Sequence, residues 1–292
     1  MSISADKIKE LRSRTQAGFM DCKKALEESD NDIEKAIAWL REKGISKAAK
    51  KASAIAAEGQ TTVVEKGDNC VVLEVNSQTD FVSKNADFVK FVKDVAEVIL
   101  KNKSADNVDS LVLPNKKTVA DTAIDLTATI GEKISVRRAQ LLTKKKGQSF
   151  GVYQHFNGRI SAAVLIDGEV SSEVGKDVAM QVASMNPKFV NSSQVDKKWK
   201  DEEEKLLIQK TIEEGKPKEF AEKIVAGRMV KMLAEVCLEE QPFIKDNGIT
   251  IIKYLKQNKA NKVLEMVRFE VGEGIEKQEA NFADEVKAQM KK

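Results

Sequence analysis

The sequence predicts an α+β fold, built from a helical N-terminal module and a core that contains both strands and helices. Apolar residues recur at helical spacing through residues 1–45, and from Gly59 onward the apolar period changes to that of strands. A plan of hairpin, helix and final strand then occurs twice, and a long charged helical segment interrupts the second copy. Because 292 residues are too many for one small core, we expect several packed units.

Residues 1–45 are predicted to form three short helices that share one small core. The first runs from Ser4 to Arg14 and the second from about Phe19 to Ser29, each with apolar residues three and four apart. The third is expected to end at Gly44, because glycine commonly follows the last turn of a helix. Residues 46–58, which contain several lysines, are expected to be a helical or flexible linker.

The first half of the core, residues 59–143, begins with a predicted hairpin. A β-branched segment from Thr61 to Glu65 and an apolar segment from Cys70 to Val75 flank a turn that contains glycine. Two helices are predicted next, a long one and a shorter one from Val119 to Ile130, and Lys133 to Leu142 then alternates like a strand.

The second half, residues 144–275, repeats this plan. Ser149 to Phe156 and Ile160 to Ile166 are predicted strands on either side of Asn157-Gly158, a helix follows, and Val263 to Val271 is the final β-rich segment.

An insertion at residues 190–234 sets the second half apart. Two charged helices, Ser193 to Glu214 and Pro217 to about Leu233, are separated only by a Gly-Lys-Pro turn. So short a connection requires them to lie antiparallel, which predicts a helical hairpin, or coiled coil.

Charge and cysteine content restrict the class of function. The chain has 49 basic and 46 acidic side chains, whereas nucleic-acid binders usually carry a large, clustered basic excess that neutralises phosphates. This balance favours a protein partner, and no direct nucleic-acid contact is expected.

Cys22, Cys70 and Cys237 form no Cys-x-x-Cys pair, so they are expected to be reduced and partly buried. Apolar runs are too short to span a bilayer and no secretory signal is evident, so we expect a cytoplasmic protein without membrane contact.

The sequence offers little for catalysis. His155 is the single histidine, no phosphate-binding Gly-x-x-x-x-Gly-Lys loop occurs, and Gly272-Glu273-Gly274 is best interpreted as a turn. The alternation of the predicted strand leaves open which face of the sheet His155 lies on. A histidine in such a place more often has a structural role, or lies at the edge of a site, than a direct functional role. We expect no enzyme, no cofactor and no bound metal.

The segment Gln78-Thr79-Asp80-Phe81-Val82 allows two interpretations. It lies between a predicted buried strand and an amphipathic helix. In the first interpretation Thr79 or Asp80 caps the helix and Phe81 turns inward. In the second, Phe81 is an exposed aromatic residue beside a carboxylate at a loop tip, which is typical of interaction sites.

Several motifs, in order from residue 11 to residue 275, resemble the elongation factor Ts family. They are Leu11 to Leu26 (LRSRTQAGFMDCKKAL), Glu74 to Val82 (EVNSQTDFV), Tyr153-Gln154-His155 with Arg159-Ile160, Gly215 to Lys218, Gly227 to Met229, Gln241 to Phe243, and Arg268 to Ile275 (RFEVGEGI).

The resemblance implies a fold and a function. The fold would comprise a ubiquitin-associated-like N-terminal module, two similar α/β core subdomains with antiparallel sheets, an inserted antiparallel coiled coil and a C-terminal helical module at 276–292. The function would be that of a translation elongation factor, a guanine-nucleotide exchange factor that binds elongation factor Tu in its GDP-bound and nucleotide-free forms.

The resemblance also implies which residues touch the partner. Thr79, Asp80, Phe81 and Val82 match the family segment that presses on the GTP-binding domain of elongation factor Tu and disturbs its magnesium site. Further partner contacts map onto His155 and onto three residues of the N-terminal module, namely Arg12, Phe19 and Met20. Phe19 stands where the family usually has methionine, and Ser161-Ala162-Ala163 replaces the usual Ile-Gly-Val.

Two other functions compete with nucleotide exchange. An RNA-binding translation protein would use the basic segments Lys47 to Lys51 and Lys144 to Lys146, but these lack the interleaved aromatic residues that stack on bases. A hydrolase would use Asp80 as a base, and no nucleophile or oxyanion site accompanies it.

Overall fold

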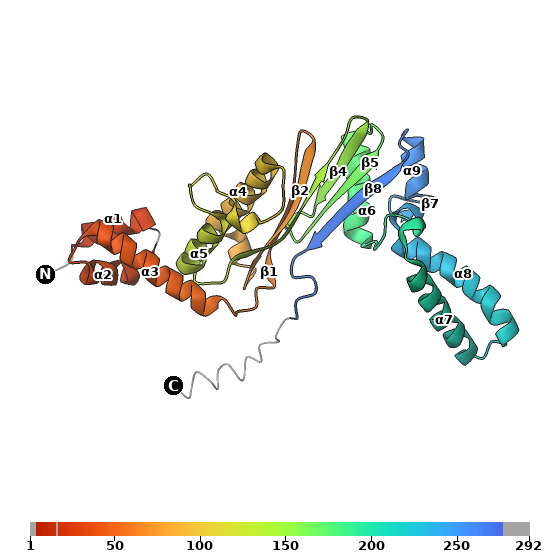
Figure 1. Cartoon of the computed structure of the whole chain (residues 1–292), viewed down its shortest axis with the longest axis horizontal. Coiled ribbons are helices and arrows are strands. Elements are labelled where there is room, and N and C mark those ends of the chain that lie inside the picture. The colour runs from red at the N-terminus through yellow and green to blue at the C-terminus, as the bar shows by residue number, and fades with distance from the viewer. Residues whose placement is uncertain (1–3, 16, 277–292) are drawn as a thin grey trace. The chain divides into compact units, whose positions relative to one another are not determined.

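The computed structural model describes residues 4–15 and 17–276 and combines helices with small sheets, as the α+β prediction requires. The described residues fall into two compact units, one from 4–61, 73–139 and 270–276, the other from 62–72 and 140–269. Figure 1 labels helices and strands of both units. The domain limits expected from the sequence stay a prediction, and the C-terminal helical module expected at 276–292 lies almost wholly outside the described residues.

Three helices open the first unit: α1 (Ala5–Thr15), α2 (Phe19–Glu28) and α3 (Ile33–Lys51). Their inward faces form one small core, to which Ile8, Leu11, Cys22, Ala25, Leu26 and Ala36 contribute. Burial raises the pKa of the Cys22 thiol, so this cysteine behaves as a small apolar residue in the core.

The third helix does not end at Gly44, and that prediction is wrong. α3 continues to Lys51 and packs against α5 (Val119–Ile130). Gly44 is buried at this contact, where an added Cβ would lie only 2.9 Å from Cβ of Ala128. Glycine therefore allows the two helices to approach closely, and it does not act as a helix stop here.

The first sheet has the strand order β1-β2-β3, with β1 (Glu58–Lys66), β2 (Asn69–Ser77) and β3 (Ser135–Thr143). β1 and β2 form the predicted hairpin, and Gly67 takes a φ of +60° in their turn. Between β2 and β3 the chain forms η1 (Val82–Lys84), α4 (Ala86–Asn102), η2 (Val108–Ser110) and α5.

The second sheet has the order β4-β5-β8, with β4 (Gln148–Gln154), β5 (Ile160–Asp167) and β8 (Lys262–Glu270). Each three-stranded sheet thus consists of a hairpin and a later strand beside the hairpin's second strand. β4 pairs antiparallel with β5, from Gln148↔Asp167 to Gln154↔Ser161. β4 ends two residues before the predicted limit at Phe156, so His155 and Phe156 belong to the turn.

β5 is apolar from Ala162 to Ile166, where both of its faces are buried. Ala162, Val164 and Ile166 join a core that includes residues of α6 (Ser172–Met185). Ala163 and Leu165, on the other face, join a second core with residues of β4 and β8.

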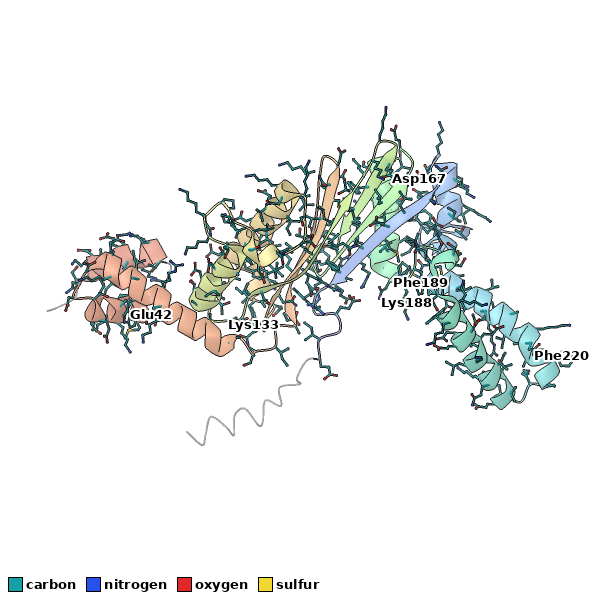
Figure 2. All side chains as sticks on the ribbon, viewed as in Figure 1. Glu42, Lys133, Asp167, Lys188, Phe189 and Phe220 are labelled. Atoms are coloured by element: carbon teal, nitrogen blue, oxygen red, sulfur yellow. The ribbon has the colours of Figure 1, made fainter. Side chains whose placement is uncertain are left out.

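The charged insertion forms the expected pair of helices, α7 (Lys197–Glu213) and α8 (Lys218–Val236), which pack against each other. Asp196 caps α7, so this helix begins four residues after the predicted Ser193. Figure 2 places Phe220 near the turn of this hairpin and Phe189 near its base. In the described part of the chain, no helix has the length and apolar character needed to cross a membrane.

The chain between α8 and β8 was not anticipated from the sequence. It forms η4 (Leu238–Glu240), a two-stranded sheet of β6 (Pro242–Phe243) and β7 (Asp246–Thr250), and α9 (Ile251–Gln257). Residues of η4, β6 and α9 complete the core under α6, among them Leu238, Phe243, Ile251 and Leu255.

A buried carboxylate in β2 ties together three segments of the first unit. Glu74 is fully buried, and its Oε1 accepts hydrogen bonds from Arg137 at 3.0 Å and from the backbone N–H of Gly272 at 2.8 Å. Its Oε2 accepts from Nε of Arg138 at 2.6 Å. Because the two arginines are themselves only partly exposed, loss of the carboxylate would remove the buried partner that they share, although Arg138 would keep its ion pair with Glu273 at 3.0 Å.

We expect Glu74→Ala to lower the free energy of unfolding by about 3 kcal/mol, the usual effect of breaking a buried ion pair. Chemical denaturation followed by circular dichroism measures the difference. Glu65→Ala is the matched control, since Glu65 pairs with Lys144 at 3.4 Å on the surface and its loss is expected to change stability by less than about 1 kcal/mol. Equal losses in the two variants would contradict the role assigned to Glu74.

Candidate functional site

The candidate site is the corner between β2 and α4, where the four residues of the central motif lie. Thr79 is partly buried and Asp80 is exposed. The Phe81 side chain is 78% exposed, while Val82, the next residue, is only 4% exposed. The corner therefore holds one apolar side chain in the interior and presents an aromatic ring beside a carboxylate to solvent.

The carboxylate of Glu132 holds this corner in place. It accepts a hydrogen bond from the backbone N–H of Thr79 at 2.9 Å and from Oγ1 of Thr79 at 2.8 Å. Next to it, the backbone N–H of Lys133 donates to Oε1 of Gln78 at 3.0 Å. Oγ of Ser77 donates to the Thr79 carbonyl at 2.9 Å. Glu132 lies in the segment between α5 and β3, far along the chain, and motif analysis gave no signal for it.

The interpretation of the motif as a helix start is wrong. Asn85 caps α4, and its Oδ1 accepts from the backbone N–H groups of Asp87 at 2.9 Å and Phe88 at 3.3 Å. The Thr79 side chain is instead bonded to Glu132, and Phe81 turns outward. The second interpretation, an exposed aromatic residue beside a carboxylate, describes the observed corner.

The three predicted residues of the N-terminal module also lie on its surface. Arg12 is exposed on α1, and Phe19 and Met20, at the start of α2, are 52% and 70% exposed. Their neighbours Leu11 and Cys22 are fully buried. Helical periodicity thus separates the core-facing residues from an outer face that combines a cation with apolar side chains.

His155 lies in the turn between β4 and β5, outside both strands, so strand alternation does not apply to it. It is exposed, and its Nδ1 is 3.2 Å from the hydroxyl of Tyr153. The ring of Phe156 meets the His155 ring edge-on at 5.4 Å and is 93% exposed. Sequence analysis missed Phe156, although an aromatic residue directly before Asn-Gly was a visible sign of exposure at a turn.

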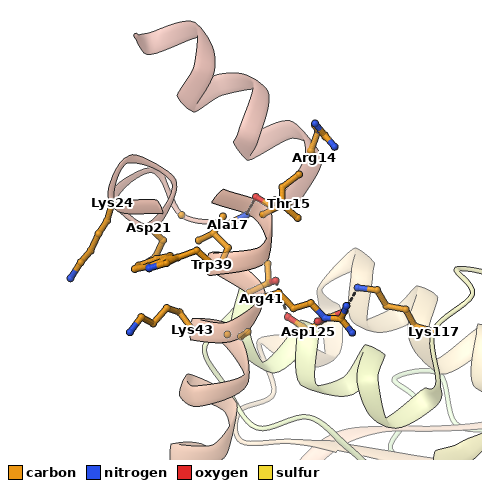
Figure 3. A pocket seen from close by; sticks show the side chains of 16 residues that line it. Arg14, Thr15, Ala17, Asp21, Lys24, Trp39, Arg41, Lys43, Lys117 and Asp125 are labelled. Atoms are coloured by element: carbon orange, nitrogen blue, oxygen red, sulfur yellow. Dashed lines mark hydrogen bonds and ion pairs between the residues drawn. The ribbon is translucent and has the colours of Figure 1, made fainter. Parts of the chain in front are cut away.

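The eight predicted residues occupy three separate segments of the chain. Figure 3 shows a cavity of about 490 Å³ in the first unit, beside α3 and α5, and none of the eight lines it. Lys43 lies over the Trp39 ring at 5.5 Å in this cavity, and Lys117 pairs with Asp125 at 2.5 Å. Among the described residues, no three His, Cys, Asp or Glu side chains gather where they could hold a metal ion. The exposed residues are therefore suited to contact with another molecule through shape, apolar area and charge.

The family model described as elongation factor TS matches residues 78–273, more than half of the chain. The match includes the corner at 79–82 and the turn with His155, and it excludes Arg12, Phe19 and Met20.

We expect Glu132→Ala to speed amide hydrogen exchange at Thr79 by about 10- to 100-fold, because charge-assisted hydrogen bonds contribute roughly 1.5–3 kcal/mol each. Exchange followed by nuclear magnetic resonance measures the change residue by residue. Glu97→Ala, at an exposed position on α4, is the control and should leave Thr79 unchanged. Undiminished protection of Thr79 in Glu132→Ala would show that the corner is held by other contacts.

Proposed function

Because the chain belongs to the elongation factor Ts family, and is thus an elongation factor of translation, we propose that it is a guanine-nucleotide exchange factor. It binds elongation factor Tu in the cytoplasm, first in the GDP-bound and then in the nucleotide-free form, and promotes release of GDP so that GTP can bind. It acts by non-covalent contact and has no catalytic residue of its own.

The exposed, fixed corner is the observation that carries this proposal. Phe81 presents most of its ring to solvent, and the Thr79–Glu132 hydrogen bonds hold the backbone that carries it. An aromatic side chain in this state gains affinity by entering an apolar pocket, and the Thr79–Glu132 bonds reduce the backbone freedom that binding would otherwise have to remove. The corner is therefore suited to act as a wedge against another protein.

Nucleotide exchange follows from thermodynamic linkage between binding of this protein and binding of GDP to the GTPase. A protein that binds the empty GTPase more tightly than the GDP-bound form must lower the affinity for GDP by the same factor. The magnesium ion is an effective target, because it bridges and neutralises the phosphates of the nucleotide. In the proposed mechanism Phe81 fills an apolar pocket of the GTP-binding domain, and Asp80 disturbs the polar groups that hold the water shell of the metal.

The other predicted residues are proposed to supply affinity. Arg12, Phe19 and Met20 are exposed on the module that the family resemblance describes as ubiquitin-associated-like, and we assign them to the partner's GTP-binding domain. His155 is assigned to another part of the partner's surface. The α7–α8 hairpin corresponds to the coiled coil that the family implies.

Two measurements test the proposal. Stopped-flow fluorescence of labelled GDP leaving elongation factor Tu, with and without this protein, measures exchange directly, and a marked acceleration is expected. Calorimetry then compares the affinity for the GDP-bound and the empty GTPase. Equal affinities would leave no free energy to displace GDP, and the mechanism would be abandoned.

We expect Phe81→Ala to slow catalysed GDP release by about 10- to 100-fold while the protein stays folded, since the ring contributes to the interface and not to the core. The stopped-flow assay at saturating protein measures this rate. Phe220→Ala, which removes a 57% exposed ring from α8, is the matched control and should keep the rate of the unmodified protein. A normal rate in Phe81→Ala would remove the wedge from the mechanism.

A further inference from the structure

The turn between β4 and β5 is a well-ordered hairpin connection. The backbone N–H of His155 donates to the carbonyl of Ile160 at 2.9 Å, and that of Gly158 donates to the carbonyl of His155 at 2.7 Å. The N–H of Arg159 donates to Oδ1 of Asn157 at 3.2 Å, and Gly158 takes a φ of +69°, which glycine adopts without strain. Three hydrogen bonds within the six residues 155–160 therefore hold the tip.

An aromatic row runs from the second unit's core out to this tip. Tyr153 is partly buried and packs against the core beneath α6, and its hydroxyl is 3.2 Å from Nδ1 of His155. The His155 ring meets the Phe156 ring edge-on at 5.4 Å. In the neutral tautomer in which the Tyr153 hydroxyl donates to Nδ1 of His155, the imidazole carries its proton on Nε2. The Phe156 ring then lies beside a hydrogen-bond donor.

Phe156 is 93% exposed, the highest value among the large apolar side chains of the described residues. Its ring contacts the His155 ring and is otherwise almost entirely open to solvent. An exposed Phe gains about 1.5–3 kcal/mol when it is fully buried, and aromatic residues held in this way are enriched at the centres of protein interfaces.

We propose that Phe156 is an anchor residue for the partner GTPase, inserting into an apolar pocket while His155 bonds to an acceptor at the pocket rim. This inference rests on the proposed function and adds to it a further contact, next to His155, at a residue that the family motifs do not include. We place this contact in both nucleotide states of the partner, where it raises affinity without changing the balance between the two states.

The chemistry of the tip favours a protein pocket over a nucleic acid. The segment Tyr153 to Ile160 contains a single cationic residue, Arg159. Surfaces that stack bases on aromatic rings combine them with a positively charged groove that follows the phosphates. An apolar ring beside an imidazole instead matches a pocket that is lined by apolar side chains and has a polar group at its rim.

The test measures the concentration dependence of GDP release from elongation factor Tu for the unmodified protein and for three variants. Phe156→Ala is expected to raise the half-saturating concentration at least about tenfold and to leave the rate at saturation unchanged. Phe220→Ala, the same change on α8, should leave both values within about twofold. Phe156→Leu, which keeps most of the apolar volume, is expected to recover part of the affinity. Circular dichroism checks that each variant is folded.

The outcomes separate this inference from the proposed function. If the unmodified protein fails to accelerate GDP release, the proposed function fails and the anchor falls with it. If it accelerates release but Phe156→Ala matches Phe220→Ala, the anchor alone is overturned. A Phe156→Ala variant that keeps its affinity for the GTPase and loses affinity for a single-stranded RNA oligonucleotide would assign the ring to nucleic acid and would also overturn the inference.

Discussion

The hydrogen bonds between Glu132 and Thr79 are the constraint on which the corner at residues 79–82 depends. A residue between α5 and β3 supplies one carboxylate, and that carboxylate fixes both the backbone N–H and the hydroxyl of Thr79. Without such a fixed point, a loop that carries an exposed phenylalanine would lower its free energy by folding the ring onto the nearest apolar surface. The hydrogen bonds remove this option, so Phe81 stays available while Val82 is buried beside it. The exposure of Phe81 thus depends on a contact between two residues, Thr79 and Glu132, that lie far apart in the sequence.

How well the sequence predicts this structure depends on the range of the interactions. Local patterns succeeded: the turn around Gly67, the helix Val119–Ile130 and the paired helices of the insertion follow from periodicity and turn residues. Gly44 was misjudged because its role is set by Ala128 on another helix, about eighty positions away along the chain. The short elements at 238–257 were missed because two- to seven-residue segments carry too few positions to show a period.

The candidate site shows the same difference between local patterns, which sequence reveals, and long-range contacts, which it does not. The motif at 78–82 could be found from sequence, but its two interpretations differ only in the direction of Phe81, and local patterns do not decide that. The decision comes from Asn85, which caps α4, and from Glu132, which engages Thr79. Once both are known, the helix-start interpretation has no capping role left for Thr79.

An exchange factor needs two kinds of contact, and the structure offers candidates for both. Contacts that form equally with the loaded and the empty GTPase bring the proteins together but do not displace the nucleotide. Contacts that form better with the empty GTPase supply the displacement, because only a difference in affinity shifts the equilibrium. A chain with 49 basic and 46 acidic residues has little net charge with which to attract a partner, so rigid apolar side chains are a reasonable source of affinity. Phe81 and Phe156 lie in different units, each on a backbone fixed by its own hydrogen bonds. The two tasks can therefore be assigned to separate residues, and a change to one ring leaves the backbone that presents the other intact.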